Sequence, residues 1–449
     1  MHSRPPLTRR RALATGAGAL AAAGALTPLA AGCSAPYDAV ASDKTRLRFW
    51  HLFAGGDGVN MTEMLDAFAA GHDSIDLETT VLQWGAPYYT KLGMAGAGGR
   101  APELAAMHLA RVPGFAPGRL LDAFDLDLLA ELGVQKDDFT PEMWERGRFG
   151  GKQYAIPLDT HPMVLYFQTE VCEKAGLLDG DGKLKPIGST ADFTAALRAI
   201  KKVTGKPALV SETLGPDCIG PWRLFSTFYS QTGGRVLSAD GKRLALDDAK
   251  ALQVLEYLAR LGEEGLMLRR VDYAGSVAQF SSGGFGFHIN GEWEVSTYQL
   301  AKTKFSMARV PGLFGRPSVQ ADCHAFVLPQ QRDRGGAPNR AAHTLVAWML
   351  RHSVDWAKGG HVPAYTPVLD DPAYVKLKPQ SEYRGVIDDV ALDDPAWFAG
   401  SASRMWIELG GVFSGVLTGT RSPRSAVTEA KKRLRTLLDT PNPLPGAAS

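Results

Sequence analysis

Aromatic and polar side chains gather where the predicted strands in the first part of the chain end. Aromatic rings can cover the C–H faces of a ligand, whereas carboxylates, amides and imidazoles pair with hydroxyl groups that lose water on binding. Such a set suits the recognition of a small molecule better than covalent catalysis. The candidates are His51, Phe53 and Asp57 after the first strand, Gln83, Trp84 and Tyr88 after the second, and His108 and Arg111 after the third.

The sequence motifs give less support to a phosphate site, a hydrolase active site or a metal site. GGDGVN lies between a strand and a helix, where a phosphate can bind, but it lacks the third glycine of GxGxxG, and no GK[ST] occurs. Asp57 and Asp159 are a carboxylate pair of the type that glycan hydrolysis uses, yet nothing in the sequence activates them. We therefore expect no cofactor and no metal. The histidines near strand ends, which lack close metal-ligand spacing, are His51, His108, His161, His324 and His361.

The elements that must position these side chains alternate between strand and helix. A Gly-rich turn, AGGDG, is expected to lead from the first strand into the first helix. This alternation predicts an α/β domain with a largely parallel sheet, and amphipathic helices farther along the chain indicate a second such region. The predicted strands span residues 46–53, 75–84 and 102–110, and the main predicted helices span 59–72, 87–98, 190–205, 221–234, 247–265, 339–351 and 425–439.

The stretch YAIPLDTHPMVLYF, residues 154–167, is apolar but is interrupted by Pro157, Asp159, His161 and Pro162. Proline lacks the N–H that a central strand donates to its neighbour. We therefore interpret the stretch as two strands with a crossing between them, rather than as one buried strand.

Four segments resemble maltose-binding protein and its relatives, the extracellular solute-binding proteins of carbohydrate ABC importers. VAQFSSGGFGFHINGEWE (277–294) is similar to the helix, glycine turn and strand that lead to Asn-Gly-x-Trp in that family. GGKQYAIPLDTHPMVLYF (150–167) resembles its first interdomain crossing, and ADCHAFVLP (321–329) resembles the return crossing. GHVPAYTPVL (360–369) looks like the late loop that passes the cleft again.

The resemblance implies an α/β, two-lobed periplasmic-binding-protein fold of the class II type, with hinged lobes and a ligand cleft between them. It implies a carbohydrate ligand, ABC permease subunits as membrane partners, a monomer, and no enzymatic activity. The cleft residues that it implies are Asp159 and His161 at the crossing, and Asn290, Gly291 and Trp293, the last stacking on a sugar ring. Trp222 and His361 are further candidates that we expect from the second lobe because of their residue types.

The start of the chain is predicted to be an export signal. Thr8, Arg9, Arg10 and Leu13 resemble a twin-arginine signal, and general secretion stays open as the alternative. LAAGC resembles a lipobox, which predicts lipidation of Cys33 and attachment to the outer face of the cytoplasmic membrane. The expected divisions are 1–33 for the signal, 34–45 for a tether, 46–157 with 320–352 for the N-terminal lobe, and 158–319 with 353–449 for the C-terminal lobe.

Charge and cysteine content narrow the classes of function. The formal charge is +2, but residues 1–32 hold four arginines and no acidic residue, so the rest has 45 basic against 47 acidic residues. That balance argues against nucleic-acid binding. Outside the cytoplasm any two of Cys172, Cys218 and Cys323 could pair, and the sequence does not choose between them.

Three alternatives remain open. The same fold could bind a glycerophosphodiester or another polyol, which a cleft with several lysines or arginines would favour. The protein could be a secreted glycan-cleaving enzyme. It could also be a surface lipoprotein without a role in transport.

Overall fold

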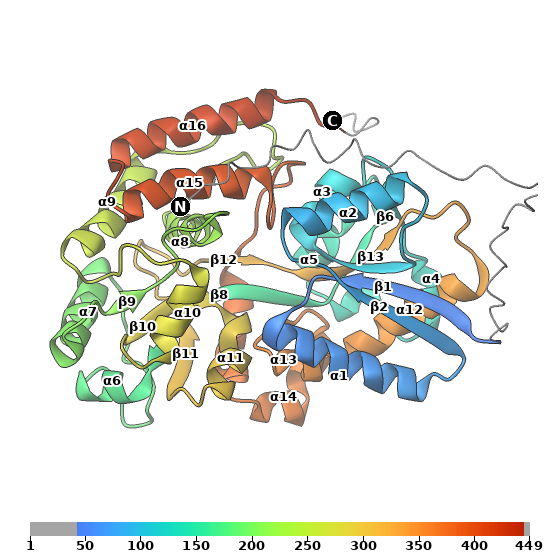
Figure 1. Ribbon diagram of the computed structural model, residues 1–449, viewed down its shortest axis with the longest axis horizontal. Coiled ribbons are helices and arrows are strands. Elements are labelled where there is room, and N and C mark those ends of the chain that lie inside the picture. Colours follow the sequence, from blue (N-terminus) through green and yellow to red (C-terminus); the bar gives the residue numbers. More distant parts are fainter. Residues whose placement is uncertain (1–42, 444–449) are drawn as a thin grey trace, which may run out of the picture. The chain divides into compact units, whose positions relative to one another are not determined.

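Two large β-sheets, each with its own apolar core, form the part of the chain that the structure describes, residues 43–443 of a computed structural model. Helices flank both sheets (Figure 1). Among residues 43–443, no helix is both long enough and apolar enough to cross a membrane. The predicted export signal and Cys33 lie outside the described residues.

The first sheet follows the predicted alternation of strands and helices. Strand β1 (Thr45–His51) pairs in parallel with β2 (Ile75–Val81) and with β3 (Leu104–His108). Helix α1 (Gly55–Gly71) connects β1 to β2, and α2 (Ala86–Ala97) connects β2 to β3. The prediction of a parallel α/β arrangement is confirmed for this region.

The start of α1 corrects one expectation. AGGDG was expected to be a turn that precedes the helix, but the helix begins at Gly55. Gly55 has a φ of +58°, which lets the chain turn sharply after β1 and enter the helix at once. Asp57 consequently lies in the first helical turn, where the helix dipole favours a negative charge.

The second sheet is built around β8 (Asp159–Gln168), all of whose residues are buried. Its path runs β15-β12-β8-β10-β9, and β11 and β14 also pair with β8. Strands β10, β11, β12 and β14 all run antiparallel to β8. These strands are β9 (Leu209–Val210), β10 (Phe287–Gly291), β11 (Phe305–Arg309), β12 (Val319–Asp322), β14 (Val362–Pro363) and β15 (Val390–Ala391).

The interrupted apolar stretch is two strands, as predicted. Strand β7 (Ala155–Pro157) belongs to the first sheet, and after Leu158 the chain enters β8 of the second. Pro162 lies inside β8, where it pairs with Ala321 of β12 and falls between the residues that pair with β14 and those that pair with β10.

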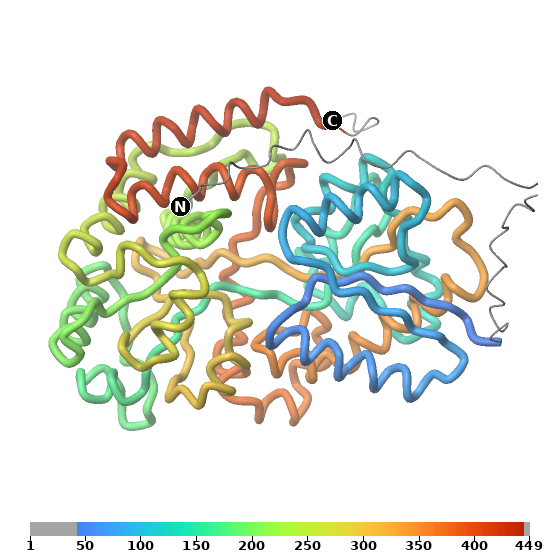
Figure 2. Tube along the Cα trace, in the orientation of Figure 1, coloured from blue at the N-terminus to red at the C-terminus, as the bar shows by residue number. Residues whose placement is uncertain are grey.

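The return crossing runs beside the first one (Figure 2). Strand β12 ends at Asp322 in the second sheet, and β13 (His324–Pro329) begins after Cys323 in the first. Because both connections are a single residue long, the residues around them, including Asp159 and His324, are brought together between the sheets.

The remaining helices cover the two sheets. Helix α7 confirms the helix predicted over residues 190–205: Ser189 caps its start, and Gly205, with a φ of +68°, ends it. Helix α15 was not predicted. The helices are α3 (Val112–Phe115), α4 (Leu126–Glu131), α5 (Pro141–Arg146), α6 (Thr169–Lys174), α7 (Thr190–Thr204), α8 (Ile219–Gln231), α9 (Asp248–Glu263), α10 (Tyr273–Ser281), α11 (Val295–Leu300), α12 (Gly336–Arg351), α13 (Ser353–Ala357), α14 (Pro372–Lys376), α15 (Arg404–Leu417) and α16 (Pro423–Asp439).

We call the part packed on the β1 sheet the first lobe and the part packed on the β8 sheet the second lobe. Trp356 and Val368 pack in the first core, whereas Tyr383 and Trp406 pack in the second. The lobe boundaries expected from the sequence stay a prediction.

Cysteines 172, 218 and 323 are all free, and the first and the last are buried in different cores, so those two cannot pair.

Candidate functional site

A cavity of about 440 Å³ lies where the two lobes meet, a size within the roughly 300–1,000 Å³ of small-molecule pockets. The first lobe contributes residues that follow its parallel strands: Phe53 after β1, Trp84 after β2 and His108 at the end of β3. Asp57 of α1 and His324 at the start of β13 complete this wall. Parallel strands end at one edge of a sheet, which explains why these side chains converge.

The second lobe forms the opposite wall. His161 comes from β8, and Glu212 follows β9. Arg223 lies on α8 and Tyr273 begins α10. Trp293 lies on a short 3₁₀ helix directly after β10.

Six residues singled out from the sequence line this cavity, and the other candidates are not part of its lining. His324, considered only among the strand-end histidines, lines it as well. Acidic and aromatic residues that follow β9 and open α10 were missed, because a strand end was not followed to its polar side chains in this part of the chain as it was in the first lobe. The six are Phe53, Asp57, Trp84, His108, His161 and Trp293, and the missed residues with polar side chains are Glu212, Asp217, Arg223, Asp272, Tyr273 and Glu294.

Two predicted aromatic residues belong to the cores. The hydroxyl of Tyr88 donates hydrogen bonds to the backbone carbonyls of Trp50 and Ala106, so its ring holds α2 on the sheet. Trp222 is 1% exposed and stacks near Phe413 of α15. Both residues lie outside the cavity lining.

Three further candidates also lie outside the lining. His51 is buried and stacks on Phe53 from behind. Gln83 is exposed. The guanidinium of Arg111 packs 4.6 Å from the ring centre of Tyr89, at the side of the first lobe.

Trp293 is held in a fixed orientation. A Cβ atom on Gly291 would lie 1.9 Å from the Trp293 ring, so the absence of a side chain lets the indole lie over the backbone of β10. The indole N–H donates to the hydroxyl of Tyr273 at 2.6 Å, and that hydroxyl donates to the carboxylate of Glu294. The result is a preorganised aromatic surface in the wall of the cavity.

Arg223 connects aromatic rings of both lobes. Its guanidinium carbon lies 4.6 Å from the ring centre of Trp293 and 5.9 Å from that of Trp84. Successive residues of a helix point about 100° apart, so Arg223 faces the cavity because Trp222 enters the core. Among the described residues, no carboxylate lies within ion-pair distance of this guanidinium, which leaves its donors available to a ligand.

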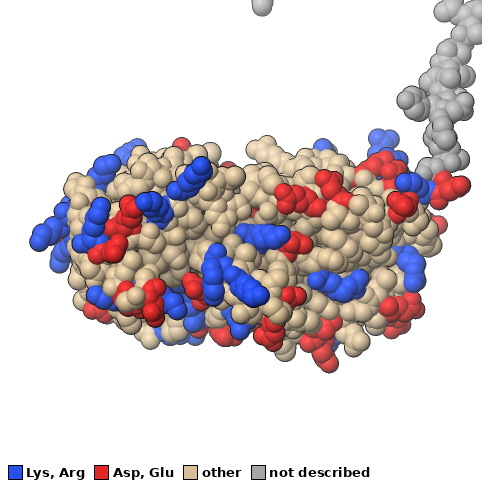
Figure 3. Space-filling model, turned by 90° about the horizontal axis from the view of Figure 1, so that it is seen from below, with Lys and Arg blue, Asp and Glu red and all other residues tan. Residues whose placement is uncertain are grey.

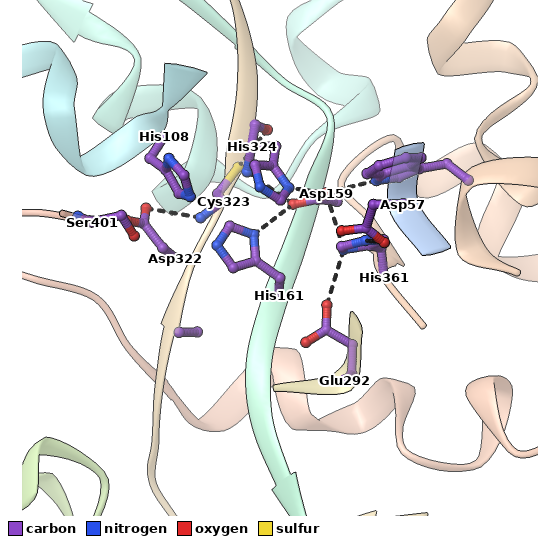
Figure 4. A network of polar contacts seen from close by, with 12 residues as sticks. Asp57, His108, Asp159, His161, Glu292, Asp322, Cys323, His324, His361 and Ser401 are labelled. Carbon is purple, nitrogen blue, oxygen red and sulfur yellow. Dashed lines mark hydrogen bonds and ion pairs between the residues drawn. The ribbon is translucent and has the colours of Figure 1, made fainter. Parts of the chain in front are cut away.

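Asp159 is fully buried beneath the cavity, where it orients two of the lining histidines (Figure 4). Its carboxylate accepts hydrogen bonds from Nδ1 of His161 at 3.0 Å, Nδ1 of His324 at 2.8 Å, and the indole of Trp356 at 2.7 Å. Burial alone would raise the pKa of Asp159, but His324, His361 and these hydrogen bonds hold it well below its usual value. Asp159 therefore supports the site from below.

Two of the lining histidines, His108 and His161, are neutral hydrogen-bonding groups. Burial lowers the pKa of His161 to about 3 and the pKa of His108 well below its usual value. Nδ1 of His108 faces the hydroxyl of Tyr89, and Nδ1 of His161 faces Asp159, so Nε2 is the free nitrogen of each ring. A neutral imidazole can accept from, or donate to, a ligand hydroxyl.

His361 joins the lobes through charged contacts under the cavity (Figure 4). Its Nε2 lies 3.0 Å from Asp57 of α1, and its Nδ1 lies 3.0 Å from Glu292 and 3.4 Å from Asp159. Burial alone would lower the pKa of His361, but Asp57 and Asp159 outweigh it and raise the pKa well above its usual value. Asp57 thus links the cavity to a buried cation at the lobe boundary.

The same network is the group of described residues that could hold a metal ion. Asp159, His161, His324 and His361 offer ligand atoms within 4.8 Å of one another, a donor set that suits zinc. However, the Asp159 carboxylate already accepts from the Trp356 indole and the His324 backbone, donors that do not release their protons. A metal would have to compete with them, and hydrogen bonding alone accounts for the cluster.

Known proteins share this architecture. The family model of the bacterial extracellular solute-binding protein matches residues 63–380. The GacH receptor of Streptomyces glaucescens GLA.O is similar at a TM-score of 0.75 and 19% identity, covering 88% of this chain and 98% of that one. The cyclic α-maltosyl-1,6-maltose binding protein from Arthrobacter globiformis has a TM-score of 0.70 and 20% identity, covering 88% and 99%.

A third similar structure is maltose-bound MalE3 of T. maritima, with a TM-score of 0.74, 17% identity, and coverage of 88% and 100%. The comparison with curated proteins finds no match. These likenesses confirm the predicted two-lobed periplasmic-binding-protein fold.

Proposed function

The chain belongs to the bacterial extracellular solute-binding protein family, and on that premise we propose that it captures a mono- or oligosaccharide for an ABC importer. The observation that carries the proposal is the cavity between the lobes, in which the fixed indole of Trp293 lies beside neutral imidazoles and carboxylates. A sugar presents C–H faces to an aromatic ring and hydroxyl groups to polar side chains, so this combination matches its surface.

The similar structures support the ligand class. The GacH receptor is described in complex with acarbose, the Arthrobacter globiformis protein as binding cyclic α-maltosyl-1,6-maltose, and MalE3 as bound to maltose. This chain shares their fold and has its cavity between the lobes.

A bound ligand would contact both walls of the cavity. Trp84 and Trp293 supply rings from opposite lobes, and the hydroxyl-binding groups that face the same space include His108, His161 and Asp57. A ligand that contacts both walls binds the closed arrangement better than an open one and so favours closure. The one-residue connections at Leu158 and Cys323 are the places where the lobes would rotate.

The alternatives have less support. A glycerophosphodiester would meet five lining carboxyl groups and one arginine, an unfavourable field for an anion. Glycan hydrolysis would need Asp57 and Asp159 as free catalytic carboxyl groups. Asp159 is instead buried and held by hydrogen bonds, which favours a binding protein that is not an enzyme.

Export and anchoring belong to the same proposal. The signal in residues 1–33 would carry the chain across the membrane, and lipid attachment at Cys33 would hold it on the outer face, close to the permease subunits. The two-lobed monomer would release its ligand to those subunits.

A thermal-shift screen of the purified protein tests the proposal. The panel contains mono- and oligosaccharides, polyols and glycerophosphodiesters, each in excess. A ligand at a hundred times its dissociation constant adds about 2.7 kcal/mol of stability, which a melt resolves. A shift with a saccharide supports the assignment. A shift with a phosphodiester alone, or with nothing in the panel, would contradict it.

A further inference from the structure

The charge of the cavity lining is strongly one-sided. On the face of the molecule seen in Figure 3, lysines and arginines lie among the acidic residues, so neither sign dominates. Among the described residues that line the cavity, Arg223 is the one arginine beside five carboxyl groups, of which Asp57 is already paired with the buried His361. The five are Asp57, Glu212, Asp217, Asp272 and Glu294.

Three of these carboxyl groups lie together in the second lobe. Glu212 and Asp217 belong to the loop between β9 and α8, and Asp272 caps the start of α10. Oε2 of Glu212 accepts the backbone N–H of Gly220 at 2.9 Å, and among the described residues no cation lies within ion-pair distance of it. Burial raises the pKa of Glu212 to about 7; the charge of Arg223 opposes this shift, and the charges of Asp217 and Asp272 add to it.

A second observation indicates that a ligand with hydrogen-bond donors binds in the cavity. His161 is 4% exposed, lines the cavity, and keeps its Nε2 without a hydrogen-bond partner. A buried acceptor without a partner is costly, and a ligand that supplies a donor removes that cost. An ammonium group offers three donors and a positive charge.

Arg223 is near enough for its charge to act on Glu212, but among the described residues it forms no ion pair with any of the five carboxyl groups. Its guanidinium packs 4.6 Å from the ring centre of Trp293 and 5.4 Å from that of Trp406, so it contacts aromatic faces instead. The same rings would attract a cationic ligand, because the face of an indole is negative.

We propose that the cavity selects saccharides that carry a basic amine, with the ammonium group held by Glu212, Asp217 and Asp272 and the sugar ring against Trp84 and Trp293. This inference rests on the proposed function and narrows its ligand class. The carboxyl groups act in two ways, since they attract the amine and repel acidic sugars.

Calorimetric titration of the full protein with matched sugar pairs provides the test. The pairs are glucosamine and glucose, galactosamine and galactose, and the glucosamine dimer and cellobiose, which differ in an amine against a hydroxyl. In at least one pair we expect the amine to bind about tenfold tighter or more at low ionic strength. The advantage should shrink as salt is added, because screening weakens the attraction.

Two variants test whether the acidic residues of the second lobe cause the preference for an amine over a hydroxyl group. Glu212→Gln keeps an acceptor for Gly220 and should lower the ratio of amine to hydroxyl affinity about tenfold. Asp217→Asn, in an exposed loop position, should lower the same ratio even if the first variant folds poorly. Glu256→Gln on the exposed face of α9 is the matched control and should leave the ratio unchanged.

The outcomes separate this inference from the proposed function. If neutral sugars bind as well as their amines in every pair, the inference is wrong and the saccharide proposal stands. If no sugar of either kind binds, both are wrong. An amine preference that survives Glu212→Gln and Asp217→Asn would also overturn the assignment to these residues.

Discussion

The indole N–H of Trp293 donates a 2.6 Å hydrogen bond to the hydroxyl of Tyr273, and this contact sets the angle of the aromatic surface in the cavity. Both residues lie in the second lobe, on separate elements that follow β10 and open α10. The aromatic surface is therefore positioned before any ligand arrives, which lowers the entropy that binding must overcome.

Replacing Trp293 with Ala should abolish measurable saccharide binding, because the cavity loses its oriented ring. The residue is only partly buried, so we expect the fold to persist. Calorimetric titration with the sugar found in the screen measures the loss, and circular dichroism checks the fold. Trp293→Phe should retain part of the affinity. An unchanged affinity in Trp293→Ala would refute the stacking role.

Tyr273→Phe should weaken saccharide binding roughly two- to tenfold, which corresponds to one hydrogen bond of about 0.5–1.5 kcal/mol. The ring stays, but the hydroxyl that links Trp293 to Glu294 is lost. The dissociation constant is the readout. Thr194→Val removes a hydroxyl in the same lobe away from the cavity and serves as the control. Equal affinities in all three proteins would argue against a positioning role for Tyr273.

Asp159→Asn should lower the free energy of unfolding by about 3 kcal/mol, because it removes one partner from a buried charged network. The carboxylate accepts hydrogen bonds from several N–H groups, and the NH₂ group of an asparagine would place a donor against some of these donors. Binding should weaken at least about tenfold, since His161 and His324 lose their orientation. Urea denaturation measures the first effect and titration the second. Asp76→Asn, exposed on β2, should change neither.

His288→Leu should reduce the sensitivity of the protein to acid. His288 is buried, neither ring nitrogen has a hydrogen-bond partner, and burial lowers its pKa to about 3. In the unfolded chain this histidine takes up a proton below about pH 6.5. As the pH drops, the unfolded state therefore binds this proton at a higher pH than the folded state does. The free energy of unfolding then falls between about pH 6.5 and pH 3, by up to about 1.4 kcal/mol per pH unit.

Urea denaturation of wild type and His288→Leu across this pH range provides the measurement. The leucine variant should lose less stability than wild type as the pH drops, and should be about as stable as wild type above pH 7. Identical slopes in the two proteins would show that His288 does not contribute to acid unfolding.

Local patterns predicted much of the fold. The alternation of strand and helix over β1–β3 and the caps of α7 depend on neighbouring residues, and these predictions are confirmed. Pro157 and Pro162 indicated a crossing, and the chain does change sheets at Leu158, directly after Pro157 ends β7, whereas Pro162 lies inside β8. Helix α15 was not predicted from the sequence.

The wall of the cavity was predicted only in part, for a geometric reason. Strand ends of a parallel sheet converge, so Phe53, Trp84 and His108 were accessible to sequence reasoning. On α8 the composition drew attention to Trp222, but the orientation of the helix places its neighbour Arg223 in the cavity instead. Which of two adjacent helical residues faces a site depends on what the helix packs against.

By itself, the sequence determined the class of fold, the crossing between sheets and the aromatic and polar chemistry of the ligand site. Only the tertiary structure decided that Asp159 and His361 lie beneath the cavity and that the lining is acidic. Residues 57, 159, 292 and 361 come from segments far apart in the chain, and their charges interact strongly because the two crossings bury them together. Burial and the sum of nearby charges are properties of the packed chain, and no local pattern records them.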